Sequence, residues 1–204
     1  MDIFTDREDY GVFLSYLKTY LLPKNTDKLY TIISNQKSTA KDKDTAIREL
    51  NLNNFYGKID LVAYCLMPNH YHMLVTQKET TGIEIFMKSL MTRYTQYFNK
   101  RHKRVGPVYQ SRYKAVLVDT DAQLLHLTRY IHCNPERTVL FQQPSSYPIY
   151  LRKIKQDWVK PDFILQNFAK TGFNSYQSFV ESKDSELEEQ TFRTISKIAI
   201  DFES

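Results

Sequence analysis

The segment that most constrains the fold lies near the middle of the chain. Residues 58–67 read KIDLVAYCLM, Pro68 and Asn69 follow, and residues 70–77 read HYHMLVTQ. Two β-forming runs separated by a Pro-Asn turn predict an antiparallel β-hairpin. Whatever surrounds this hairpin has to cover its apolar side chains.

Before and after the hairpin, apolar residues recur at helical spacing. This spacing predicts one helix over residues 9–22, which Pro23 ends, and another over residues 81–103, which starts at the N-cap Thr81 and stops before Gly106-Pro107. A strand is predicted over residues 112–118, RYKAVLV, and a helix over residues 122–134 that stops before Pro135. The order α-β-β-α-β-α indicates an α+β fold in which helices cover one face of an antiparallel sheet.

Two stretches fall outside this plan. Residues 24–54 are polar and are interpreted as an insertion or long loop, with one short helix at most, over residues 41–50. A connector rich in Pro and Ser starts at Gln142, and short helices are predicted over residues 162–169 and 175–182. The chain therefore ends in a small helical extension.

Composition narrows the setting of the protein. The 204 residues are 42% hydrophobic, enough for a core, and their formal charge of +5 leaves room for a polyanionic partner. Two cysteines, Cys65 and Cys133, lie in segments predicted to be buried, which favours a reducing compartment over a disulfide framework. Apolar runs are too short to span a membrane, and the acidic N-terminus is unlike a signal peptide, so we expect a cytoplasmic location.

The second strand of the hairpin carries two histidines. His70 and His72 are two residues apart, so on a strand their side chains leave the same face of the sheet and can bind one metal ion. Tyr71, Met73 and Val75 then point to the other face, toward the helices. The alternative is a pair of surface histidines without a ligand.

The last predicted helix of the core carries Tyr130 and Asn134, four residues apart and on one face with His126. A phenol can act as a nucleophile on phosphorus, and a carboxamide one turn away can complete the coordination of an ion. In the alternative, Tyr130 packs in the core and Asn134 ends the helix. His132 faces away from Tyr130 and is expected to be a packing residue.

Basic and aromatic residues alternate between positions 92 and 114. Such a segment can hold phosphates while its rings stack on unpaired bases, although a basic helix end also serves simply to solvate a surface. The candidate DNA-binding residues are Arg93, Lys100, Arg101, Lys103, Arg104, Tyr109, Arg112 and Lys114.

Five segments of the sequence carry a resemblance to a known family. In chain order they are IFTDREDYGVFLSYL, MPNHYHMLV, FMKSLMTRYTQYFNKRH, GPVYQSRYKAVLVD and RYIHCNP. Together they resemble the REP-associated tyrosine transposases and the wider single-tyrosine, IS200-like insertion-sequence transposases. The resemblance covers residues 3–140. It implies a ferredoxin-like sheet in an endonuclease domain over residues 1–140, followed by the connector and helical extension over residues 141–204.

The resemblance also implies a chemistry. His70 and His72 would be metal ligands, Asn134 the third, amide-type ligand, and the ion Mg²⁺ or Mn²⁺. Tyr130 would attack a phosphodiester in single-stranded or hairpin DNA, leaving a 5′-phosphotyrosine and a free 3′-hydroxyl that can later reverse the reaction. Insertion-sequence members of the family work as dimers and REP-associated members can be monomeric, so a homodimer is one expectation.

One departure from the family concerns the sheet. Family members carry a strand before the IF-x-x-x-x-DY helix, beside the histidine strand, whereas here Met1 stands almost on that helix. The sheet is thus expected to lack its first strand unless upstream sequence, a neighbouring chain or the 24–54 segment supplies it. Otherwise the chain is a non-catalytic or decayed DNA-binding relative. A metal-binding protein unrelated to DNA is the third possibility.

Overall fold

A computed structural model describes residues 1–137 and 143–200, with the backbone alone at 135–137, 188 and 195–200. The α+β class predicted from the sequence is confirmed. In chain order the elements are α1 (Arg7–Leu21), α2 (Thr26–Ser34), α3 (Ala40–Asn51), β1 (Ile59–Met67), β2 (His70–Gln77), α4 (Gly82–Arg101), α5 (Asp121–Arg137), α6 (Tyr147–Tyr150), α7 (Asp162–Leu165), α8 (Tyr176–Glu181) and α9 (Ser185–Ile200).

The predicted hairpin is confirmed. Strands β1 and β2 pair antiparallel, and the register places Cys65 opposite His72 and Met67 opposite His70. A bulge in β1 interrupts the register between Leu61 and Ala63. Strand β1 is buried along nearly its whole length, whereas both ends of β2 are exposed.

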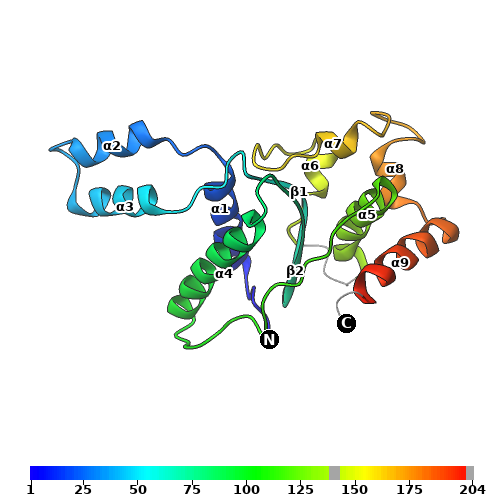
Figure 1. The fold of residues 1–204 in the computed structure, drawn as a ribbon, viewed down its shortest axis with the longest axis horizontal. Coiled ribbons are helices and arrows are strands. Elements are labelled where there is room, and N and C mark those ends of the chain that lie inside the picture. The colour runs from blue at the N-terminus through cyan, green and yellow to red at the C-terminus, as the bar shows by residue number, and fades with distance from the viewer. Residues whose placement is uncertain (138–142, 201–204) are drawn as a thin grey trace.

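Each face of the hairpin supports its own apolar cluster. On one face Leu61, Tyr64 and Leu66 join residues of α1 and α4, including Phe13 and Leu90. On the other face the cluster contains side chains of β1 and of α5, α6, α7 and α8, including Cys65, Ile131, Tyr150, Ile164 and Tyr176. Helices α1 and α4 thus form the expected layer, and α5 adds a second layer on the opposite face (Figure 1).

The outer edge of β1 is covered by the C-terminal part of the chain. The amide of Leu66 donates to the carbonyl of Pro144 at 2.9 Å, and that of Lys160 donates to the carbonyl of Leu61 at 2.8 Å. The free edge of β2 pairs with no described segment. The amides of Ile3 and Phe4 donate instead to the carbonyl of Pro68, at the turn end of the hairpin.

The prediction of a strand over residues 112–118 is wrong. These residues form no ladder with any described segment. In a ferredoxin-like sheet the last strand pairs with the first, and no described segment occupies the place of that first strand. A β-prone sequence without a neighbouring strand gains no ladder hydrogen bonds, and propensity alone does not supply them.

Residues 24–54 form a pair of helices. The short helix expected over residues 41–50 is confirmed as α3, but α2 was not foreseen. Asn25 caps α2 and Thr39 forms a capping box with Asp42 at the start of α3. The pair projects from one end of the molecule (Figure 1), so it does not supply the strand beside β2.

The helix that carries Tyr130 runs farther than predicted. It continues through Pro135 to Arg137, where the sequence predicted an end before Pro135. A proline inside a helix removes one amide donor, and this helix continues only two residues beyond it. The predicted segments 162–169 and 175–182 contain α7 and α8, whereas α6 and α9 were not foreseen. The predicted boundary between residues 140 and 141 lies outside the described residues.

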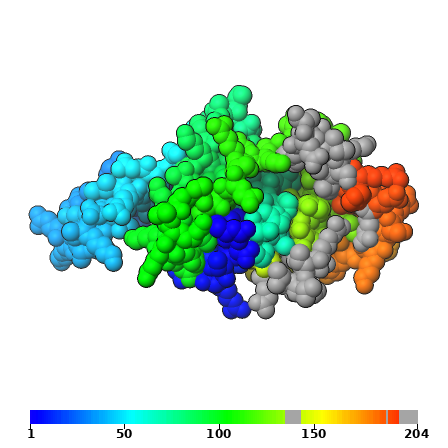
Figure 2. Space-filling view, turned by 90° about the horizontal axis from the view of Figure 1, so that it is seen from below, coloured from blue at the N-terminus to red at the C-terminus, as the bar shows by residue number. Residues whose placement is uncertain are grey.

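The molecule is elongated, with the α2–α3 pair at one end and the C-terminal helices at the other (Figure 2). The N-terminal residues, in blue, lie beside the green segment that contains the end of α4 (Figure 2). None of the described helices combines the length and the apolar character that a bilayer crossing requires.

Candidate active site on strand β2 and helix α5

The two histidines open strand β2, as the sequence predicted, and their rings lie together. Their centroids are 4.9 Å apart with the planes at 84°. Tyr71, Met73 and Val75 pack on the opposite face with α1 and α4, which confirms the predicted register. His70 is exposed and His72 is half-buried.

Hydrogen bonding distinguishes the two imidazoles. Nδ1 of His70 shares a hydrogen bond with Oδ1 of Asn69 at 2.7 Å. Because a carbonyl oxygen can only accept, this bond places the proton on Nδ1 and leaves Nε2 of His70 with a free lone pair. Nε2 of His72 is buried and has no hydrogen-bond partner.

Burial keeps both rings neutral. It lowers the pKa of His70, and it lowers the pKa of His72 to about 4, with a further contribution from the nearby His70. Neutral imidazole is the form that binds a metal ion. A buried ring nitrogen without a hydrogen-bond partner therefore fits a metal ligand better than it fits a packed core histidine.

Helix α5 brings Tyr130 to this pair. The rings of Tyr130 and His72 have centroids 5.4 Å apart and planes at 76°. Tyr130 is half-buried and also packs against the cluster that contains Ile131. The structure therefore joins two predicted site residues that belong to different elements.

Asn134 lies one helical turn beyond Tyr130. Its Nδ2 is buried and has no hydrogen-bond partner. The helix does not end at Asn134, so this side chain does not serve as the terminal cap that was the alternative interpretation. Among the described residues, no group of three or more His, Cys, Asp or Glu could hold a metal ion, and Asn134 is the amide that the sequence predicted as the third ligand.

The other histidines of α5 have structural partners. His132 is 2% exposed, and its two ring nitrogens share hydrogen bonds with the hydroxyls of Tyr176 at 2.6 Å and Ser146 at 2.7 Å. Burial lowers the pKa of His132 to about 3. The expected packing role of His132 is confirmed. His126 shares a hydrogen bond with Thr191 of α9.

Three of the candidate DNA-binding arginines already have neighbours in the fold. Arg101 forms ion pairs with Asp6, Glu8 and Asp9 at the start of α1. The guanidinium of Arg93 lies 3.8 Å from the ring centroid of Tyr16, and that of Arg104 lies 5.7 Å from the ring of Phe98. Nη1 of Arg93 and Nη1 of Arg104 are buried without a partner.

The remaining candidates occupy the end of α4 and the loop after it. Lys100, Lys103, Arg112 and Lys114 are exposed. Tyr109 packs its ring 6.1 Å from that of Tyr71, and its buried hydroxyl has no partner. Tyr109 is therefore a packing residue whose hydroxyl is hidden, whereas the lysines and Arg112 present their charges to solvent.

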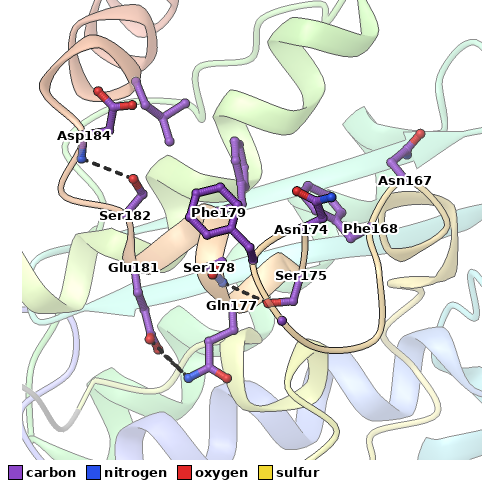
Figure 3. A pocket seen from close by; sticks show the side chains of 13 residues that line it. Asn167, Phe168, Asn174, Ser175, Gln177, Ser178, Phe179, Glu181, Ser182 and Asp184 are labelled. Atoms are coloured by element: carbon purple, nitrogen blue, oxygen red, sulfur yellow. Dashed lines mark hydrogen bonds between the residues drawn. The ribbon is translucent and has the colours of Figure 1, made fainter.

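Two hollows lie away from the histidines. The larger is built from the C-terminal segment, and its described lining contains Phe168 and Phe179 together with Glu181 and Asp184 (Figure 3). None of the described side chains that line it is basic, so it is a poor place for a phosphodiester. The smaller hollow lies between Tyr20, Lys88 and Arg93 on the outer side of α4.

Sequence reasoning missed two residues that shape the site. Asn69 was interpreted only as a turn residue, although its place next to His70 is the signal for a hydrogen bond that orients the ring. Arg129 was not singled out, and it is the largest fully buried side chain. The place of Arg129 directly before Tyr130 in the predicted helix was the signal.

The comparisons with known proteins give a family match. A family model described as "Transposase IS200 like" matches residues 26–134, which include β1, β2, α4 and both site elements as far as Asn134. No curated protein sequence and no solved structure matches the chain significantly. Since the family match spans more than half of the 204 residues, the chain belongs to the IS200-like transposase family.

Proposed function

We propose that this transposase cleaves and rejoins single-stranded or hairpin DNA through a covalent 5′-phosphotyrosine formed at Tyr130, with a divalent ion held at His70, His72 and Asn134. Membership of the transposase family makes DNA the partner. It also argues against the interpretation of the chain as a metal-binding protein unrelated to DNA.

One observation carries the proposal. The Tyr130 ring lies against His72, whose Nε2 is buried without a hydrogen-bond partner, and Asn134, one turn farther along α5, also has a buried polar atom without a partner, Nδ2. Leaving a buried polar atom unpaired costs about 1–3 kcal/mol, so such atoms gather where a ligand is to be bound. The phenol of Tyr130 beside His72 would supply the nucleophile.

The reaction exchanges one phosphate ester for another. The phenol oxygen of Tyr130 attacks phosphorus and forms a new O–P bond, while the bond between phosphorus and the 3′ oxygen breaks. The phenol proton is lost and the departing 3′ oxygen gains a proton, so no water and no nucleotide are consumed. In the reverse direction a 3′-hydroxyl attacks the phosphotyrosine and releases Tyr130.

His70 and His72 on a rigid strand, and Asn134 through its side-chain oxygen, would hold Mg²⁺ or Mn²⁺. The ion would neutralise negative charge on the phosphate oxygens and orient the scissile bond. Asn69 would keep the free lone pair of His70 on Nε2 through its hydrogen bond to Nδ1.

Contacts with the DNA backbone would come mainly from the exposed cations at the end of α4 and in the loop after it. Lys100, Lys103, Arg112 and Lys114 present charge to solvent. Arg93 and Arg104 each keep one unpaired guanidinium nitrogen, which a phosphate could satisfy after a small movement. Tyr109 and Arg101 belong to the same candidate surface, but both are engaged within the protein.

Trapping the covalent intermediate tests the proposal. Hairpin DNA labelled at its 3′ end, incubated with the protein and Mn²⁺, should yield a labelled adduct that survives denaturing electrophoresis. Tyr130→Phe should abolish the adduct, and Tyr56→Phe is a matched control because Tyr56 is 53% exposed. An adduct that persists in Tyr130→Phe would remove this residue as the nucleophile.

A second candidate is a DNA-binding relative without catalysis, and the free edge of β2 favours it. The strand that carries both histidines pairs on one side only among the described residues, and residues 112–118 form no strand. A ligand strand paired on one side is held less rigidly than one paired on both sides, and catalytic groups need to be held closely in place. This candidate predicts tight, salt-dependent binding of hairpin DNA that stays intact in Mn²⁺.

A further inference from the structure

Arg129 is a fully buried arginine whose partners all belong to the C-terminal extension. It precedes Tyr130 by one residue and is 2% exposed. Its Nε donates to the carbonyl of Phe179 at 3.0 Å, and its Nη2 donates to that of Ser182 at 2.7 Å. Nη1 lies 3.4 Å from the hydroxyl of Thr191 on α9. No carboxylate of a described side chain forms an ion pair with it.

These carbonyls belong to the end of helix α8. The last carbonyls of a helix have no partner within the helix and carry partial negative charge. Arg129 satisfies two of them, which compensates for the burial of its own charge. Figure 3 shows Phe179 and Ser182 on the segment that continues toward α9, and both α8 and α9 pack against helix α5.

A second set of hydrogen bonds, made by His132, joins helix α5 to α8 and to the hairpin. His132 shares hydrogen bonds with Tyr176, the first residue of α8, and with Ser146. The hydroxyl of Ser146 accepts a hydrogen bond from the amide of Tyr64 at 2.9 Å. Tyr64 pairs with Met73, next to His72 in the hairpin. His132 thus connects α5 both to α8 and to strand β1, which pairs with the histidine strand β2.

We propose that helices α8 and α9 act as a support for helix α5, and that Arg129 is a positioning residue that holds Tyr130 against the histidine pair. This inference rests on the function proposed above. It assigns a role to the C-terminal extension, which contributes none of the predicted site residues.

The geometry explains why position matters here. Tyr130 and Asn134 lie on the face of α5 that meets β2, whereas Arg129 and His132 point to other sides of the helix. The hydrogen bonds of Arg129 and His132 to the C-terminal extension form a clamp that opposes rotation and sliding of α5. The phenol and the amide therefore keep their place over β2. Misplacement of a reacting group by about 1 Å can slow a reaction by about 100-fold.

The test compares Arg129→Gln and Arg129→Lys with Arg193→Gln, which removes an exposed arginine of α9 that forms an ion pair with Glu189 on the same helix. Folding is checked first by circular dichroism and urea unfolding. Hydrogen exchange of α5 then reports on the clamp without DNA or metal. Single-turnover cleavage of hairpin DNA at saturating concentration, measured beside the DNA dissociation constant, reports on the position of Tyr130.

We expect amides of α5 to exchange at least about tenfold faster in Arg129→Gln. We expect the cleavage rate to fall about tenfold or more while DNA affinity stays within about twofold. Arg129→Lys should recover part of the rate because an ammonium can still donate to one carbonyl, and Arg193→Gln should match the wild type. If Arg129→Gln does not fold, Thr191→Val removes one acceptor of Arg129 together with the hydrogen-bond partner of His126, and it should give a smaller change in the same direction.

The outcomes separate the two proposals. Slow exchange of α5 in a folded Arg129→Gln protein would overturn the clamp, and fast exchange with an unchanged cleavage rate would overturn its positioning role. If the wild-type protein does not cleave hairpin DNA, the proposed function fails, and the exchange experiment still decides whether α8 and α9 hold α5 in place.

Discussion

The ring of Tyr130 stands edge-on to the ring of His72, 5.4 Å between centroids and 76° between planes. One residue comes from the long helix α5 and the other from an edge strand, so their contact depends on the packing of two elements that are distant in sequence. A buried, unpaired ring nitrogen at the same place gives this contact a chemical meaning that simple packing would lack.

Replacing His72 should separate stability from function. In His72→Phe the ring volume is nearly kept while the unpaired buried nitrogen is lost, so without metal the free energy of unfolding should stay the same or rise by about 1 kcal/mol. Mn²⁺ should stabilise the wild type in proportion to its occupancy and should leave the variant unchanged. Urea unfolding with EDTA or with Mn²⁺ measures both effects.

A marked loss of stability in His72→Phe with EDTA present would show that the imidazole is a structural residue. His126→Phe is a useful comparison. His126 also lies in the α5 region but shares a hydrogen bond with Thr191, so its replacement should destabilise the protein and leave the response to Mn²⁺ intact.

Asp9 should be the most costly acid to remove. Its side chain has no exposed surface and accepts hydrogen bonds from Thr5, Tyr97 and Arg101, and it also contacts His102. Asp9→Asn leaves Arg101 without its buried partner, and we expect a loss of about 3 kcal/mol or more in the free energy of unfolding. Glu8→Gln, which alters an exposed partner of Arg101, should cost less than about 1 kcal/mol.

Asp9 should also affect how the free energy of unfolding changes at low pH. Burial by itself raises the pKa of Asp9, but hydrogen bonds from Thr5, His102 and Arg101 outweigh it and hold the pKa below its ordinary value of 3.8. The folded state therefore binds fewer protons than the unfolded state in this range. Its contribution to stability is complete above about pH 4 and is lost as the pH falls below that value.

Urea midpoints measured between pH 3 and pH 6 test this expectation. The wild type should lose stability below pH 4 more steeply than Asp9→Asn, which lacks the titrating group. Parallel curves for the two proteins would contradict the assigned role of Asp9.

Salt dependence should divide the candidate DNA-binding residues into two groups. Lys103 is exposed, so Lys103→Gln should reduce the salt slope of hairpin binding by about 1 and leave stability unchanged. Arg101 forms ion pairs with three acids, so Arg101→Gln should lower the free energy of unfolding with a smaller effect on the slope. Fluorescence anisotropy at several salt concentrations gives the slopes, and equal slopes for Lys103→Gln and wild type would exclude Lys103 as a phosphate contact.

The two cysteines should be inert in the folded protein. Cys65 has no exposed surface and burial raises its pKa to about 12, while Cys133 is 8% exposed. Only a thiolate attacks a disulfide reagent, so neither residue should react with Ellman's reagent until urea unfolds the chain. One thiol that reacts immediately in the native protein would show that helix α5 or strand β1 opens locally.

Local patterns in the sequence were enough for the elements that carry the site. Alternation around Pro68-Asn69 predicted the hairpin, and the register that turns His70 and His72 away from Tyr71 and Met73 follows from the period of a strand. Helical spacing predicted α1, α4 and α5. The prediction failed at residues 112–118, because a strand requires a neighbouring strand and the sequence of one segment does not reveal whether that neighbour is present.

The sequence by itself determined which residues can perform the chemistry: two imidazoles on one face of a strand, and a phenol and an amide on one face of a helix. Only the tertiary structure decided that Tyr130 meets His72, that Arg101 is engaged with Asp9, and that Arg129 ties α5 to α8. Periodicity fixes the direction of a side chain relative to its own element, whereas contacts between elements arise from burial and hydrogen bonding summed over the whole chain.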